Sequence, residues 1–155
     1  ADVDVVWLGE DMAYKNGPMV SPELIKELLV PNYKKITSFL KENGVENIFI
    51  DSDGNIESVL HLITEGGFNG ISPVEIAANM DLLKIREQYP DLKIIGGVNK
   101  LNIAKGEEGI DFELKIVEKM LEKGGYIPSF DHSVPPIVSY KNYKLYIQKL
   151  KEICQ

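Results

Sequence analysis

The chain has 155 residues, with 24 acidic and 17 basic side chains, a formal net charge of −7 and an apolar share of 44%. This balance excludes a disordered chain, and no apolar run approaches the roughly 20 residues of a membrane span. The acidic charge argues against nucleic acid or an anionic membrane as partner, and the lone Cys154 excludes a disulfide framework. We therefore expect one domain over residues 1–155, without a signal peptide, in the reducing cytoplasm.

Short runs of β-branched and other apolar residues predict five strands. The middle three runs are apolar almost throughout, which is typical of strands buried on both faces of a parallel sheet. In chain order, the runs are Val3–Leu8, Asn47–Ile50, Phe68–Ile71, Leu92–Ile95 and Tyr126–Pro128.

Amphipathic helical patterns lie between these runs. Ser21-Pro22 predicts a helix start, because serine caps helices and proline fits their first turn, while Pro31 predicts a break or kink farther along. The segment 72–75, Ser-Pro-Val-Glu, has the pattern of a capping box and predicts another helix start. Asp111 and Ser139 are the expected N-caps of the last two helices.

The alternation of strands and helices predicts an α/β fold with a parallel sheet. Five such units fit either a small doubly wound sheet or part of a (β/α)8 barrel. A whole barrel usually needs about 250 residues, so this chain is too short to form one.

Polar side chains directly follow several of the predicted strands. Because the carboxyl ends of parallel strands share one edge of the sheet, which carries the ligand site in such folds, we expect these side chains to meet in one mouth. The candidates are Glu10, Asp11, Asp51, Asp53, Asp131 and His132.

Structural roles compete with functional ones for several of these positions. Asp53-Gly54 is also a common turn pair, and Asp51 can cap the helix that follows it. The capping box explains Glu75 better than a site does, and Asn99 and Lys100 read as turn residues. His132 differs, because it adjoins a carboxylate in a strand-end loop stiffened by prolines, which favours a functional role.

Two kinds of chemistry remain open for carboxylates beside one histidine. They can bind a divalent cation such as zinc, or they can act as general acid and base. Arg86 is the only arginine, so the chain offers at most one guanidinium for gripping carboxylates or phosphates.

The order of several motifs resembles the uroporphyrinogen decarboxylase superfamily, which also includes zinc-dependent methyltransferases of corrinoid metabolism. The motifs are Gly9–Ala13, Phe49–Asn55, Gly70–Pro73, Ile95–Val98 and Asp131–Pro136. The resemblance covers nearly all of this chain but only about the C-terminal half of a family chain. It implies a TIM (β/α)8 barrel with its site at the carboxyl face, here a partial barrel of about five units.

The resemblance also implies roles for individual residues. The segment 51–54 lies where thiol-methylating relatives carry a His-x-Cys zinc pair, and His132 lies where those relatives have their last zinc-binding cysteine. Neither cysteine is present, so the expected metal ligands are His132 with Asp51, Asp53 or Glu10. The expected catalytic residues are Glu10, Asp11, Asp51 and His132.

Three functions remain open at this point. The acidic mouth without an arginine favours a methyltransferase that moves a methyl group between a small methylated substrate and a corrinoid carried by a partner protein. The alternatives are uroporphyrinogen III decarboxylase of tetrapyrrole (heme) biosynthesis, which the resemblance implies needs no metal, and a non-catalytic or incomplete fragment. Open sheet edges also predict self-association.

Overall fold

A computed structural model describes residues 3–154 and contains a five-stranded, fully parallel sheet. All five predicted strands are confirmed, with ends that differ by a few residues from those expected. β1 and β7 form the two edges, so the sheet does not close on itself within these residues. In spatial order the strands are β1 (Val5–Gly9), β4 (Asn47–Asp51), β5 (Gly70–Ser72), β6 (Lys93–Val98) and β7 (Tyr126–Phe130).

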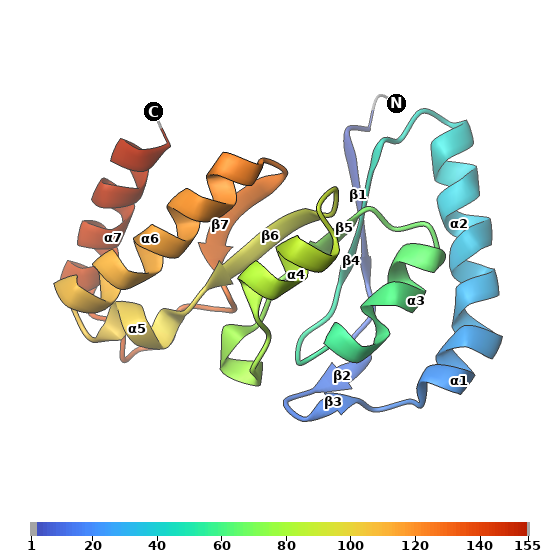
Figure 1. Ribbon diagram of the computed structural model, residues 1–155, viewed down its shortest axis with the longest axis horizontal. Coiled ribbons are helices and arrows are strands. Elements are labelled where there is room, and N and C mark those ends of the chain that lie inside the picture. Colours follow the sequence, from blue (N-terminus) through green and yellow to red (C-terminus); the bar gives the residue numbers. More distant parts are fainter. Residues whose placement is uncertain (1–2, 155) are drawn as a thin grey trace.

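Helices follow the strands, and Figure 1 shows α2 at one end of the molecule and α7 at the other. A small antiparallel hairpin of β2 (Ala13–Tyr14) and β3 (Gly17–Pro18) follows β1. No helix in residues 3–154 is long and apolar enough to cross a membrane. The α-helices are α1 (Pro22–Leu24), α2 (Val30–Glu42), α3 (Leu60–Glu65), α4 (Leu82–Gln88), α5 (Lys100–Ala104), α6 (Glu107–Lys123) and α7 (Tyr140–Ile153), and single 3-10 turns cover Glu57–Val59 and Ile76–Ala78.

Of the break or kink expected at Pro31, the break does not occur, because the helical backbone continues through this residue. A π-helical turn, Ile25–Leu29, joins α1 to α2 and places Pro31 in the first turn of α2. Proline lacks an N–H and its ring crowds the carbonyl of the preceding turn, so the wider π turn accommodates it without ending the helix.

The helix starts test the predicted caps. Ser21 and Ser139 are confirmed, since each side chain accepts a hydrogen bond from a backbone N–H of the helix that follows. Asp111 does not cap α6, which begins after Gly106; it lies inside that helix and binds Lys149. Glycine at the N-cap had no polar side chain to mark the start, so the sequence placed it several residues too late.

The predicted capping box at 72–75 is wrong. Ser72 ends β5, and α4 begins only after Asp81, whose side chain accepts a hydrogen bond from Lys84 N at 3.0 Å. Glu75 lies in the loop between them and accepts a hydrogen bond from Gly54 N in the loop after β4. A serine followed three residues later by glutamate therefore fits the end of a strand here as well as the start of a helix.

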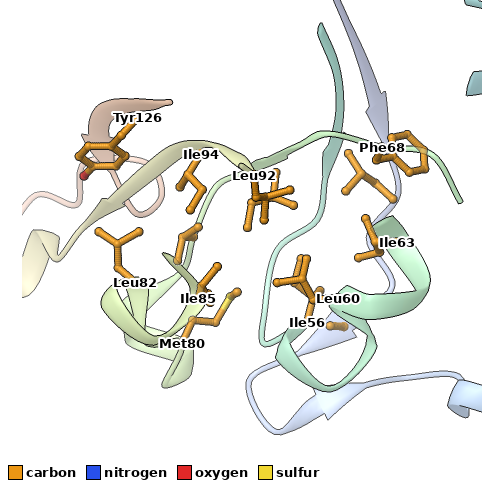
Figure 2. Close-up of a cluster of buried hydrophobic side chains, with 14 of the residues drawn as sticks. Ile56, Leu60, Ile63, Phe68, Met80, Leu82, Ile85, Leu92, Ile94 and Tyr126 are labelled. Carbon is orange, nitrogen blue, oxygen red and sulfur yellow. The ribbon is translucent and has the colours of Figure 1, made fainter. Parts of the chain in front are cut away.

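The core lies between the sheet and its helices. Ile48, Ile50, Ile71 and Ile94 point from the strands into this layer and are fully buried. Figure 2 shows side chains of α3 and α4 directed toward the strands, with Ile85 among those facing the sheet. Burial of this apolar surface holds the carboxyl ends of the strands at one edge.

The other face of the sheet is less covered. Trp7 and Phe49 lie opposite each other in register with ring centroids 5.3 Å apart, and Trp7 is 50% exposed. A hollow of about 480 Å³ lies on this face, bordered by both rings and by Ile95 and Ile127. Gly70 gives the Phe49 ring its place, because a Cβ there would lie 2.5 Å from it.

Candidate functional site

A hollow of about 450 Å³ lies at the carboxyl edge of the sheet. We call it the mouth pocket. Its walls come from the β2–β3 hairpin and from the loops after β4, β5, β6 and β7. The polar and charged residues that line it are Tyr14, Lys15, Asp53, Glu75, Lys100 and His132.

The hairpin wall is fastened to the loop after β4. Met12 N donates to Ser52 Oγ at 3.2 Å, and Asn55 N donates to the Tyr14 carbonyl at 3.0 Å. Gly54 has a φ of +79°, and a Cβ at this position would lie 2.7 Å from the Ala13 backbone. Only glycine permits both this conformation and this close approach, so the hairpin is a fixed wall.

Asp53 and His132 meet at the rim of the mouth pocket, as expected. Asp53 Oδ2 lies 3.2 Å from His132 Nε2, and the side chains are 44% and 41% exposed. Asp11 joins them, because its Oδ1 accepts a hydrogen bond from Asp53 N at 3.2 Å. Three candidates from three separate loops therefore come together.

Asp51 lies close to this group. It is the last residue of β4, beside Gly9 and Ser72 in register. Burial raises the pKa of Asp51 above its usual value, a hydrogen bond to Ser72 lowers it, and the negative charges of Asp53 and Asp11 raise it further. The result is a carboxyl group that holds its proton more tightly than a free aspartate.

Glu10 is not part of this group. Its carboxylate faces the α2 side of β1, where it acts with burial, the larger cause, to raise the pKa of Tyr33. Its backbone N–H donates to the Asp51 carbonyl at 2.8 Å, which extends the pairing of β1 with β4. Consecutive residues of an extended chain point to opposite sides, so Glu10 and Asp11 diverge.

Asp131 is fully buried and serves a different purpose from its neighbour His132. Its Oδ1 accepts from Lys100 Nζ at 2.9 Å and from Lys100 N at 3.3 Å, and its Oδ2 accepts from Ala77 N at 3.1 Å. We call this arrangement the Asp131 clamp. It ties together the loops after β5, β6 and β7.

Sequence reasoning assigned structural roles to two residues that line the mouth pocket. Glu75 Oε2 accepts a hydrogen bond from Gly54 N at 2.9 Å, and Lys100 holds Asp131. Their partners lie 21 and 31 residues away, so no local pattern marks either contact. The only sequence feature that could have indicated a site role for Glu75 and Lys100 is their position, because both residues follow predicted strands.

The predicted metal site lacks a complete set of ligands. Within residues 3–154, no group of three or more His, Cys, Asp or Glu side chains is arranged to hold a metal ion. Asp53 and His132 bond to each other, Asp11 holds a backbone amide, and Glu10 faces another way. These residues do not fit a zinc site as they stand.

The sequence profile described as uroporphyrinogen decarboxylase (URO-D) matches residues 1–153. The chain belongs to this family. No curated protein matches the chain.

Membership of the uroporphyrinogen decarboxylase family confirms the resemblance seen in the sequence. The five parallel β/α units are part of a TIM (β/α)8 barrel. Active sites of such barrels lie at the carboxyl face, where the mouth pocket is found. Members of this family are enzymes.

Proposed function

We propose that this member of the uroporphyrinogen decarboxylase family is a methyltransferase that acts on a small methylated substrate and passes the methyl group to a corrinoid carried by a partner protein. The observation that carries the proposal is the distribution of charge at the carboxyl edge. Three aspartates gather there, and the chain's only arginine lies elsewhere.

Arg86 serves the opposite edge of the sheet. It is buried, and its Nη1 and Nη2 donate to the carbonyls of Pro90 at 2.6 Å and Gly125 at 3.2 Å. Both carbonyls lie in the turns that lead into β6 and β7. This guanidinium is therefore occupied with the backbone, far from the site edge.

A polycarboxylate substrate needs several cationic groups around it. Asp11, Asp51 and Asp53 present negative charge instead, and the lining of the mouth pocket offers two lysines, Lys15 and Lys100, of which Lys100 also bonds to Asp131. The mouth formed by these residues suits a small neutral or cationic substrate better than a porphyrinogen with many carboxylates.

Asp51 suits the role of general acid in methyl transfer. When a neutral substrate loses its methyl group as a cation, the atom that carried it keeps the electron pair of the broken bond and needs a proton, whereas a quaternary ammonium leaves as a neutral amine and needs none. The raised pKa of Asp51 lets this carboxyl hold such a proton more tightly than a free aspartate does. Asp53 orients His132 at the rim, which steadies the imidazole beside the substrate. The corrinoid, when its carrier docks, supplies the acceptor for the methyl group.

The experiment uses the full protein with reduced cobalamin and a panel of small methylated amines, alcohols and sulfides. We expect the absorbance of cobalamin to change as it becomes methylated, and Asp51→Asn to slow that change about 100-fold or more with the neutral substrates of the panel. Glu118→Gln, on the exposed surface of α6, is the matched control and should leave the rate unchanged.

Uroporphyrinogen provides the opposing measurement. We expect no release of carbon dioxide from it under the same conditions. Decarboxylation of uroporphyrinogen without methylation of cobalamin by any compound in the panel would overturn the proposal.

A further inference from the structure

We propose that the mouth pocket binds a small zwitterion, with a carboxylate on the side of Lys15 and Lys100 and a methylated ammonium group on the side of Asp53 and Glu75. The identity of the methylated group rests on the proposed function. The binding of a zwitterion rests on the pocket itself, whose lining includes two lysines and two carboxylates from different segments.

The cationic groups come from the hairpin, which carries Lys15, and from the start of α5, which carries Lys100. Lys100 Nζ has three protons, of which one is donated to Asp131 at 2.9 Å, and its side chain is 12% exposed where it lines the pocket. Lys15 lines the same pocket from the exposed hairpin and makes no ion pair within residues 3–154. Two ammonium groups thus have hydrogen-bond capacity for an anionic group.

The anionic side comes from the loops after β4 and β5. Glu75 uses Oε2 to hold Gly54 N, and Asp53 uses Oδ2 to meet His132. The second oxygen of each carboxylate has no hydrogen-bond donor among the described residues, so each can face a cation. Tyr14, 73% exposed, also lines the pocket and adds an aromatic ring of the kind that attracts methylated ammonium groups.

The two sides are held at fixed positions before any ligand arrives. The bond from Gly54 N to Glu75 joins the loops after β4 and β5, and the Asp131 clamp joins the loops after β5, β6 and β7. Asn55 ties the hairpin to the same frame through the Tyr14 carbonyl. A pocket whose walls are already ordered loses little entropy when it binds a small ligand.

Three ligands of similar size separate the contributions of the two charges. Glycine betaine carries both charges, choline lacks the carboxylate, and tert-butylacetate replaces the ammonium nitrogen with a neutral carbon. In calorimetric titration of the full wild-type protein, we expect glycine betaine to bind about tenfold or more tightly than either of the others.

Variants then assign each charge to its residue. Lys15→Met should weaken binding of glycine betaine and tert-butylacetate about tenfold and leave choline unchanged, whereas Asp53→Asn should weaken glycine betaine and choline and leave tert-butylacetate unchanged. Lys119→Met and Glu118→Gln, both exposed on α6, are the matched controls and should bind all three ligands as the wild type does.

Equal affinities of the wild type for the three ligands would overturn this proposal, and so would weak binding of all of them. That comparison needs no variant, so a substitution that merely unfolds the protein cannot obscure it. The proposed function fails separately: if glycine betaine binds with the expected pattern but no methylated compound methylates cobalamin, the zwitterion site stands and the methyltransferase does not.

Discussion

A carboxylate–lysine pair and a carboxylate–histidine pair occur at the same edge of the sheet, and their surroundings differ. In the Asp131 clamp, the carboxylate is fully buried and Lys100 is 12% exposed. In the pair at the rim, Asp53 and His132 are 44% and 41% exposed. The clamp also satisfies two backbone N–H groups, whereas the rim pair consists of one contact at 3.2 Å.

The difference indicates that the buried Asp131 contributes mainly to stability, whereas the exposed Asp53–His132 pair is suited to ligand contact. A buried carboxylate must be fully bonded, and removing it leaves its partners desolvated and alone. An exposed pair is screened by water and contributes little to folding, so its atoms remain free to meet a ligand. Asp131 and His132, although adjacent in sequence, thus have different roles: Asp131 stabilises the fold and His132 is exposed to ligand.

The largest expected effect comes from breaking the clamp. Asp131→Ala leaves the Lys100 ammonium and the Ala77 N–H without their acceptor, and we expect a loss of about 3–5 kcal/mol in the free energy of unfolding. Chemical denaturation of the full protein measures it.

Asp53→Ala is the matched control for the clamp. It removes a carboxylate of the exposed pair and should cost less than about 1 kcal/mol. Equal losses in the two variants would show that burial does not separate the pairs, and the comparison would fail.

The sequence could predict the five strands and two of the four named helix starts, but it could predict neither the Asp131 clamp nor the Asp53–His132 pair in full. Runs such as Asn47–Ile50 carry their own signal, because burial on both faces demands apolar residues in succession. The clamp has no such signal, since Lys100 and Asp131 are brought together only by the packing of β6 against β7. The same limit misplaced Glu75, whose partner lies in another loop.

The hairpin was missed for a different reason. Asn16-Gly17 is a local turn signal between β2 and β3, but each strand is only two residues long. Such short strands have no alternating pattern to read. Their position is fixed by hydrogen bonds to Ser52 and Asn55, which the sequence does not reveal.

An intermediate effect is expected at Gly54, whose backbone directly follows Asp53 of the rim pair. Gly54→Ala places a Cβ 2.7 Å from the Ala13 backbone in addition to its strained φ of +79°, and we expect a loss of about 2–3 kcal/mol. Thermal and chemical unfolding of the full protein measure the loss.

Gly44→Ala provides the control for Gly54→Ala. Gly44 has a similar φ of +83°, but a Cβ there meets no atom within 4 Å, so the expected loss is only about 1 kcal/mol. Matching losses would mean that the backbone angle alone accounts for the effect and that the hairpin is not pressed against this turn.

The smallest expected effect concerns Asp51, at the carboxyl end of β4. Its raised pKa means that the folded protein binds this proton more tightly than the unfolded chain does. Stability from this group is therefore present at low pH and is lost as pH rises through the raised pKa. Above that raised pKa the ionised carboxylate costs stability, and Asp51→Asn removes the cost.

We expect Asp51→Asn to raise the melting temperature by about 2 °C at pH 7 and by less at pH 4. Ser72→Ala serves as a companion variant, because losing its hydrogen bond to Asp51 should raise the pKa of Asp51 further and enlarge the pH dependence. A gain from Asp51→Asn that is the same at both pH values would contradict the assignment of the raised pKa to Asp51.

The half-exposed Trp7 makes the uncovered face of the sheet visible to fluorescence. It is the only tryptophan in the chain, it lies beside Phe49 on that face, and half of it contacts solvent. Any polypeptide that covers this face, whether further β/α units or a second copy, would move its emission to shorter wavelengths and shield it from a water-soluble quencher. The intrinsic emission of this single side chain therefore reports, in dilute solution and without a label, how completely the barrel interior is enclosed.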